Sequence, residues 1–332
     1  MAGKINTKQV ILDNLATSTW YDVRKTIIDQ VFQITPFWDM LQKNGKIKEK
    51  APDGTHFEYP VKYAKQDQNR KWFGRGDTFG KSEKESNTRM YFFTRNVGTN
   101  VVRFWDDDRK NKGKAKIYSY IEDLVQNAKD SLVDGFEVDS LTQNPDALAM
   151  DSLPTLVSTT PTVGTLGGLT RADNSYLQNQ VKDFVGLTTG TNLLDEMTTM
   201  YNNCSVWKGG NKRTPDIILT SRKVYQDYER ICRALHQIVA NETSRAGLGF
   251  GSLMFKNVEL FWAPQITDNR MYFLNSDTLE LPYDPDAWFE MTEWKYVADS
   301  LDRMAQIVCV CNLICTSPQK NGVIYNITTV TN

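Results

Sequence analysis

The chain has 332 residues, of which 40 % are apolar and 24 % are charged, and its formal net charge is -1. This length suffices for two modest domains or for one domain with a large insertion, and the composition is typical of a globular protein. The near-neutral charge disfavours a protein whose main task is to bind nucleic-acid phosphates, because such proteins carry a basic excess. The first residues lack the apolar run of a secretory signal, and no later run approaches a membrane span, so we expect synthesis in the cytoplasm and no membrane partner.

The chain has five cysteines, an odd number for its length, which does not resemble a disulfide framework. Cys309, Cys311 and Cys315 lie close together in CVCNLIC, and alternate residues of a strand share one face. A zinc site would need a fourth ligand, and neither His56 nor His236 is near in the sequence. Buried thiols without a metal are therefore expected.

The segment TWYDVRKTIIDQVFQITPFWDMLQ has apolar side chains at helical spacing, at Val23, Ile27, Val31 and Phe32, and Pro36 is expected to end this turn. It predicts a helix or arm that leads into a strand. The spacing changes to the two-residue period of strands in THFEYPVKY and again in TRMYFFTRNVGTNVVRFW. These segments predict the two strands of a hairpin, which flank the polar stretch 64–88.

This polar stretch is unusually basic. Between Lys62 and Arg89 the chain carries eight Lys or Arg and four Asp or Glu residues, with few side chains that can form a core. An isolated two-stranded ribbon is marginally stable in water, so the hairpin is expected to contact another surface.

The tip of the hairpin, FGRGDTFG, contains an Arg-Gly-Asp tripeptide and spaced glycines. No helix follows to complete a nucleotide-binding loop, and no secretion signal supports cell adhesion. We interpret Trp72 and Phe73 as apolar anchors, and Arg75 and Asp77 as directional polar contacts, of a tip that docks on a partner.

The longest helical pattern covers residues 117–141, where apolar side chains form one stripe. Residues 142–190 are rich in Thr, Pro, Gly and Ser and predict extended loops. Helices are expected at TNLLDEMTTMYNNC and after Ser221, with a short buried strand, DIILT, between them. This order of helices and strands from about 155 to 285 indicates a mixed α+β unit. The last stretch predicts two or three strands, and NVVRFW after the hairpin is their expected partner.

Signatures of catalysis are missing from the sequence. There is no nucleophile elbow, Walker loop, HExxH pair or paired-carboxylate motif, and the glycine-rich 247–251 follows a helix where a dinucleotide site would precede one. Asp106, Asp107 and Asp108 are expected on a strand or turn, where they would point in different directions. We predict no enzyme activity, no catalytic residue, no cofactor and no metal.

Several segments, taken in order, resemble those of a known family. They are the polar hairpin, FWDDDRKN, the long helix, GGLTRADN, DIILTSRKVYQDYE, GFGSLMFKNVELFWAPQ and RMYFLNSDTLEL. From about residue 36 onward the chain is similar to the major capsid protein of tailed bacteriophages, the Hong Kong 97 type. Gly167, Gly168, Leu169 and Arg171 match a Gly-Gly-aliphatic-x-Arg stretch of relatives, and Tyr176 falls near a position where many carry tryptophan.

The resemblance implies an α+β Hong Kong 97-like capsid fold and a domain plan. The plan has a peripheral domain with a long spine helix and a β-sheet, an axial domain, an extended β-hairpin loop and an N-terminal arm. Its expected bounds are 1–35 for the arm, 36–51 for the first peripheral part, 52–94 for the hairpin loop, 95–154 for the peripheral domain with its spine helix at 117–141, 155–285 for the axial domain and 286–332 for the peripheral return strands.

The same resemblance implies a structural subunit that self-assembles into pentamers and hexamers of an icosahedral viral shell around double-stranded DNA. Its implied partners are copies of itself, a portal, scaffolding or decoration proteins and the packaged DNA, which it would contact without sequence preference, and its implied place is the virion. The inter-subunit contact is predicted to join the basic hairpin to an acidic stretch between Asp277 and Trp294 of a neighbouring copy. Its predicted residues are Arg70, Lys71, Trp72, Phe73, Arg75, Asp77, Asp284, Asp286 and Glu290.

Two alternatives stay open at this point. A cellular nanocompartment shell, similar to an encapsulin, would have the same fold and enclose protein cargo. A soluble metal-dependent hydrolase would use Asp106 to Asp108 to bind its metal.

Overall fold

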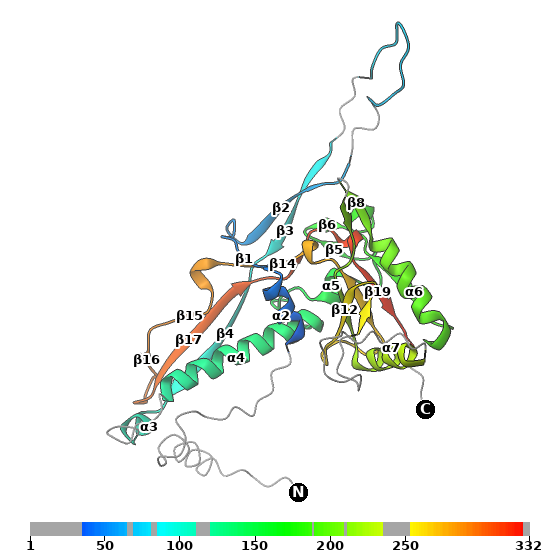
Figure 1. The fold of residues 1–332 in the computed structure, drawn as a ribbon. Helices are drawn as coiled ribbons and strands as arrows, with labels where there is room; N and C mark the ends of the chain where they lie inside the picture. Colours follow the sequence, from blue (N-terminus) through cyan, green and yellow to red (C-terminus); the bar gives the residue numbers. More distant parts are fainter. Residues whose placement is uncertain are drawn as a thin grey trace. The chain divides into compact units, whose positions relative to one another are not determined.

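The computed structural model describes residues 35–64, 69–80, 85–110, 120–187, 189–208, 211–234 and 253–327. Helices and strands are mixed along the chain, so the fold is of the α+β class (Figure 1). The chain divides into two compact units, and the segments Asn96–Phe136 and Asp286–Val310 of the first interrupt the second in sequence. The described part of the chain contains no helix that is both long and apolar enough to cross a membrane.

The first unit contains Asn96–Phe136 and Asp286–Val310. Its central strand is β17 (Arg303–Cys311), which pairs with β4 (Arg95–Arg103), β15 (Glu290–Met291) and β16 (Lys295–Tyr296). Burial alternates along β17, with Ala305, Ile307, Cys309 and Cys311 buried, as expected for a strand with one face on a core. The predicted pairing of NVVRFW with the last third of the chain is confirmed by β4 and β17.

Two helices belong to the same part of the sequence. They are α3 (Trp105–Lys110) and α4 (Tyr120–Leu141), of which α4 confirms the predicted long helix over its described length. The buried ring of Phe136 on α4 stacks on Trp288 with a centroid distance of 5.9 Å and meets Phe289 edge-on. The apolar stripe of the helix thus packs on the segment that precedes β15.

The second unit contains Pro36–Arg95, Glu137–Pro285 and Cys311–Asn332. Its main sheet has the strand order β11-β12-β10-β13-β19-β7, with parallel pairs at β10–β12 and β19–β7 and antiparallel pairs elsewhere. The bounds of these strands are Met254–Phe255 for β11, Val258–Trp262 for β12, Ile217–Thr220 for β10, Met271–Leu274 for β13, Gly322–Tyr325 for β19 and Gln180–Asp183 for β7. All residues of β10 and β13 are buried, which confirms the predicted buried strand DIILT.

Two helices pack on this sheet and share one hydrophobic core with it. They are α6 (Thr189–Cys204) and α7 (Arg222–Ala234), and Figure 1 shows both beside the sheet. The core joins Leu193, Met197 and Met200 of α6 and Val224 and Tyr228 of α7 to side chains of β10, β12, β13 and β19. The expected helices TNLLDEMTTMYNNC and the one after Ser221 are thereby confirmed, the second as far as Ala234.

The remaining elements of the second unit are short. β1 (Ile47–Glu49) runs parallel to β14 (Leu279–Tyr283), and β18 (Ile314–Cys315) pairs with the same strand. The others are α5 (Leu153–Leu156), the strand pairs β5 (Thr165–Leu166) with β6 (Leu169–Thr170) and β8 (Val206–Lys208) with β9 (Asn211–Arg213), and single 3-10 turns at Ser175–Leu177, Ser276–Thr278, Pro285–Ala287 and Pro318–Lys320.

Pro36 begins helix α2 (Pro36–Lys43), and the helical segment expected before it lies outside the described residues. Proline suits the first position of a helix, where its missing N–H is not needed. The next two N–H groups, of Phe37 and Trp38, donate to the carboxylate of Glu137 at 3.1 and 2.8 Å. Glu137 lies on α4 and is 1 % exposed, so the cap comes from a residue about 100 positions away.

The sheet that the last strand joins differs from the domain plan that the resemblance implies. Residues 286–332 were grouped with the peripheral domain, but β19 pairs with β13 and β7 of the second unit. A run of β-branched residues shows that a strand is buried without showing which sheet receives it. The expected N-terminal arm, His236 and the glycine-rich 247–251 lie outside the described residues.

Candidate functional site

The candidate site is the predicted hairpin, formed by β2 (His56–Lys62) and β3 (Asn87–Phe93). The strands are antiparallel with seven residue pairs, from His56 opposite Phe93 to Lys62 opposite Asn87, and Figure 1 shows them side by side. Phe57, Met90 and Phe92 are buried on one face of the ribbon, which matches the predicted two-residue period. The base of the hairpin is therefore held by a core, whereas its tip is not part of the paired ribbon.

A glycine pair holds β3 close to the body of its unit. The N–H of Tyr91 donates to the carbonyl of Gly167 at 3.1 Å. A Cβ atom added to Gly167 would lie 2.7 Å from the Cβ of Met90, and one added to Gly168 would lie 2.9 Å from the Tyr91 ring. Both glycines have positive φ, of 56° and 76°, so glycine is required here by backbone conformation and by space.

Arg171 follows the glycine pair and is almost completely buried, with 2 % exposure. Its guanidinium donates to the carbonyls of Thr155 at 2.7 Å and Leu156 at 3.0 Å and to the Asn179 amide oxygen at 3.4 Å. Burial lowers the pKa of Arg171 from its usual value. Arg171 thus fixes the loop that carries the glycine pair and takes no part in an exposed contact.

Aromatic and charged contacts hold the other strand of the hairpin. Tyr63, just after β2, stacks on Tyr176 with a centroid distance of 5.3 Å. The hydroxyl of Tyr59 donates to Glu280 at 3.3 Å, and the Lys50 ammonium lies 3.3 Å from the centre of the Tyr59 ring. Burial, together with the charge of Glu280 and its hydrogen bond, raises the pKa of Tyr59 far above its usual value, so the phenol stays protonated.

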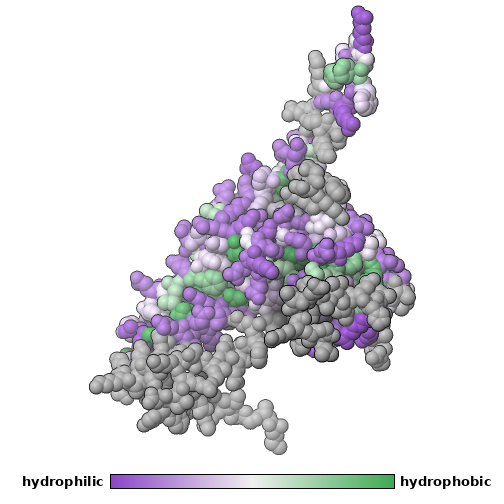
Figure 2. All heavy atoms as spheres, viewed as in Figure 1, coloured by the Kyte–Doolittle hydropathy of each residue, from purple (hydrophilic) through white to green (hydrophobic). Residues whose placement is uncertain are grey.

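The tip, residues 69–80, exposes large apolar side chains. Trp72 is 96 % exposed, Phe73 67 % and Phe79 54 %, although the rings of Phe73 and Phe79 meet at 5.0 Å. Trp72 has no ring contact with any residue of the described chain. Figure 2 shows hydrophobic atoms among hydrophilic ones at this tip. Exposure of this kind is typical of an interaction site.

The Arg-Gly-Asp tripeptide forms a tight turn at the tip. The N–H of Asp77 donates to the Gly74 carbonyl at 3.3 Å, and the Asp77 carboxylate accepts from the Gly74 N–H at 2.8 Å. Gly76 has a φ of 93°, which the third position of such a turn requires. Asp77 therefore shapes the turn, while Arg70, Lys71 and Arg75 are exposed.

The acidic residues predicted to face the hairpin lie in different surroundings. Asp284 is half-buried at the end of β14, whereas Asp286 and Glu290 are exposed residues of the first unit. Asp277 and Glu280 belong to the same acidic stretch of the sequence, but both form ion pairs within the subunit. Asp277 pairs with Lys46 at 3.2 Å, and Glu280 pairs with Lys48 at 2.5 Å. Sequence reasoning missed these pairs because β1 and β14 are more than 200 residues apart.

The residues considered for metal chemistry do not form a metal site. Asp106, Asp107 and Asp108 lie on helix α3, contrary to the predicted strand or turn. Among the described residues, no group of three or more His, Cys, Asp or Glu side chains is placed to hold a metal ion. The five cysteines are buried free thiols, and burial raises the pKa of Cys315 to about 11 and of Cys204 to about 12, which disfavours the reactive thiolate.

No protein-family model matches the sequence, and no curated protein gives a significant sequence match. Solved structures do match. A chain of the cyanophage A-1(L) capsid asymmetric unit has a TM-score of 0.61 and 16 % identity, over 92 % of this chain and 97 % of that chain. The chain has the Hong Kong 97-type capsid fold. This confirms the fold that the sequence resemblance implies.

Two further structures support the same Hong Kong 97-type fold. The capsid of Myoviridae phage XM1 matches with a TM-score of 0.55 and 10 % identity, over 98 % of this chain and 99 % of that chain. The holo-SrpI encapsulin complex of Synechococcus elongatus PCC 7942 matches with a TM-score of 0.57 and 12 % identity, over 99 % of each chain. The neighbours are shell proteins of both viral and encapsulin type.

Proposed function

We propose that this chain is the major structural subunit of an icosahedral phage capsid. In this proposal, pentamers and hexamers of the chain close into a shell around double-stranded DNA, and the chain acts as a structural protein of the virion. The Hong Kong 97-type fold supports it, because phage capsid chains match over nearly the whole length of both partners. A portal and scaffolding or decoration proteins would be further partners.

The observation that carries the proposal is the exposed hairpin tip. Trp72 is 96 % exposed, and three basic side chains surround it in sequence. An exposed aromatic residue next to arginine is the usual composition of an interface hot spot. A subunit that works alone would gain nothing from this arrangement, whereas a shell subunit buries it on a neighbouring copy.

Charge is proposed to orient this contact. Arg70, Lys71 and Arg75 would approach the acidic stretch of the neighbour that contains Asp284, Asp286 and Glu290. Charges steer association over about 10 Å at moderate salt and select the correct partner, without the need for direct ion pairs.

The test is charge reversal at the tip, with Arg70→Glu, Lys71→Glu and Arg75→Glu in one variant. We expect the variant to fold with unchanged unfolding free energy, because the three side chains are exposed, and to form few or no particles. The matched control exchanges the same residues without changing charge, as Arg70→Lys, Lys71→Arg and Arg75→Lys, and should assemble. Normal particles from the reversed variant, seen by electron microscopy, would refute the interface.

A nanocompartment shell is the second candidate, since an encapsulin matches over 99 % of both chains. The content of purified particles separates the two functions. Nuclease-protected double-stranded DNA inside the particles supports the capsid, and a stoichiometric protein cargo without DNA supports the nanocompartment.

A further inference from the structure

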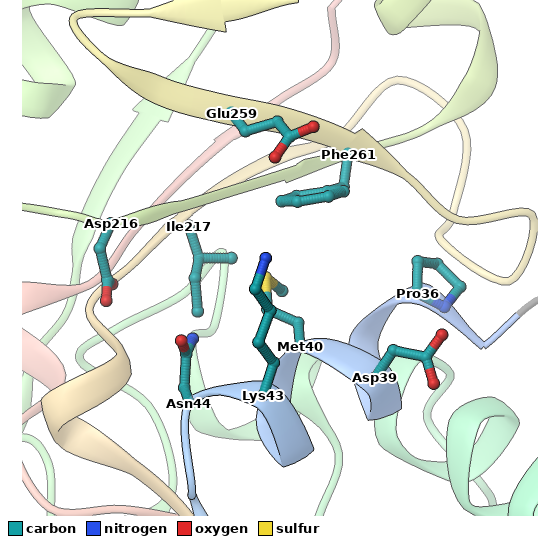
Figure 3. Close-up of a pocket in the computed structure, with 9 residues that line it drawn as sticks. All are labelled: Pro36, Asp39, Met40, Lys43, Asn44, Asp216, Ile217, Glu259 and Phe261. Atoms are coloured by element: carbon teal, nitrogen blue, oxygen red, sulfur yellow. The ribbon is translucent and has the colours of Figure 1, made fainter. Parts of the chain in front are cut away.

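The second unit contains a pocket of about 510 Å³ that no predicted contact uses. Helix α2 forms one wall, and the start of β10 and strand β12 form the other (Figure 3). A cavity of this size lies in the range that holds small ligands and exceeds what one indole ring requires. Its lining residues are Pro36, Asp39, Met40, Lys43, Asn44, Asp216, Ile217, Glu259 and Phe261.

The pocket combines an apolar floor with a charged rim. Pro36 and Phe261 are partly exposed and offer an apolar contact surface, whereas Met40 and Ile217 are buried behind the lining. In Figure 3, Lys43 extends from α2 into the space between the walls, and Glu259 lies on the opposite wall. Such a site suits a side chain with an apolar body and polar neighbours.

The charges of the rim are largely unused within the subunit. Asp39, Lys43 and Glu259 form no ion pair or hydrogen bond through their side chains with residues in the described ranges. Asp216 is the exception, because its carboxylate accepts from the N–H of Ser276 at 2.7 Å and from the Ser276 hydroxyl. The rim therefore leaves two carboxylates and one ammonium available to a partner.

The charges that line the pocket are opposite in sign to those of the hairpin tip. The pocket is lined by three acids and one base, whereas residues 69–80 carry three bases, Arg70, Lys71 and Arg75, and one acid, Asp77. The tip also presents the exposed ring of Trp72, which is apolar like the floor of the pocket. A protruding basic segment with an unpaired aromatic ring and an acidic hollow with an apolar floor are complementary in charge and in polarity.

We propose that the hairpin tip of one copy inserts Trp72 into this pocket of a second copy. The indole would lie on Pro36 and Phe261, and the basic side chains beside it would face Asp39 and Glu259. Lys43 would contact the face of the ring, an arrangement that stabilises cations next to tryptophan. The acidic stretch around Asp284 then orients the approaching tip, and the pocket anchors it. This inference rests on the proposed shell function and names the receptor for its hairpin.

The experiment is a disulfide cross-link between the tip and the pocket in assembled particles. Thr78 on the tip and Asn44 on the pocket rim are both exposed and uncharged, so Thr78→Cys with Asn44→Cys leaves every proposed contact in place. The native cysteines within the described ranges are buried, which keeps background oxidation low. The matched control joins Thr78→Cys to Asn203→Cys, an exposed residue of α6 that does not line the pocket.

We expect the oxidised double variant to give a ladder of covalent oligomers on a denaturing gel, and the control pair to stay monomeric. A band at monomer mass with an internal cross-link would overturn the proposal, because the tip would then occupy its own pocket. Normal particles without any cross-link would also overturn it while leaving the shell function intact. If no wild-type particles form, the shell function itself fails.

A charge swap gives an independent readout. Asp39→Lys with Glu259→Lys should lower the assembled fraction by about tenfold or more, as expected for loss of an interface anchor. Adding Arg70→Glu and Lys71→Glu to that variant should raise the assembled fraction again, although not to the wild-type level, because the acidic stretch around Asp284 is unchanged and repels the reversed tip. Equal defects in the double and the quadruple variants would contradict pairing between these residues.

Discussion

Glycine 167 shows how one residue sets the position of the hairpin. Its positive φ and its approach to Met90 both exclude a side chain, and its carbonyl accepts a hydrogen bond from β3. A glycine with positive φ is common in turns. The short distance between Gly167 and Met90, however, places this loop directly against the hairpin that carries the proposed interface.

Gly167→Ala is expected to lower the unfolding free energy by about 1–3 kcal/mol beyond the backbone strain, since its Cβ would meet the Cβ of Met90 at 2.7 Å. Gly164→Ala is the control, because Gly164 also has a positive φ, of 88°, but has nothing within 4 Å of the added atom. Denaturant unfolding of both variants measures the difference. Equal losses would show that steric contact with the hairpin contributes nothing.

Asp151 predicts a pH dependence of stability. Burial raises the pKa of its carboxyl, although the amide of Asn312 donates to it at 2.9 Å and Arg95 is near enough to oppose the shift. A carboxyl whose pKa is higher in the folded state holds its proton more tightly when folded. The stability from this residue is thus present at low pH and is lost as the pH rises through the folded pKa.

The variant Asp151→Asn removes this titration and keeps an amide oxygen as acceptor for Asn312. Its unfolding free energy relative to the wild type should increase as the pH rises from about 4 to 7. Unfolding curves of both proteins across this range measure that difference. A constant difference would mean that Asp151 titrates alike in the folded and unfolded chains.

Among single residues, the sequence revealed those with a local signature and missed those defined by distant contacts. The Gly-Gly-aliphatic-x-Arg match pointed to Gly167, Gly168 and Arg171, and the structure gives each a structural role. The approach of Gly322 to helix α6, where an added Cβ would lie 2.8 Å from the Cys204 sulfur, has no signature in the sequence. A contact between residues more than 100 positions apart leaves no pattern in the sequence around either residue.

Helix α2 illustrates, among the elements, how a distant side chain decides where a helix begins. Its first free N–H groups bond to Glu137, and without this carboxylate the helix would start with unsatisfied donors next to a buried core. The helix in turn forms one wall of the proposed docking pocket.

Glu137→Gln is expected to cost about 1–3 kcal/mol of unfolding free energy, because a neutral amide offers one acceptor where the carboxylate offers two. Glu122→Gln, an exposed position on the same helix α4, should change stability by about 0.5 kcal/mol or less. Thermal or denaturant unfolding checks both. A similar loss in the two variants would attribute the effect to the charge of α4 and not to the cap.

Elements with a strong local period were predictable, and elements defined by their partners were not. The long apolar stripe predicted α4, and the buried run before Ser221 predicted β10. The three consecutive aspartates were expected on a strand or turn, yet they lie on helix α3. The last strand, β19, was placed with the wrong unit because its burial pattern does not specify which sheet it joins.

The whole molecule consists of two units with their own strands and helices and a hairpin whose tip finds no support among the described residues of its own chain. Burial of the core explains why each unit folds. It does not explain an exposed tryptophan flanked by arginine and lysine, or a pocket with the opposite charges. The proposed closed lattice would account for both features, because every copy would supply one tip and one pocket and each modest contact would be repeated.

Electron microscopy of the purified chain at high concentration tests this account most directly. We predict that the chain forms closed particles of uniform size. A chain that stays monomeric under these conditions, in sedimentation as well as in the images, would contradict the account.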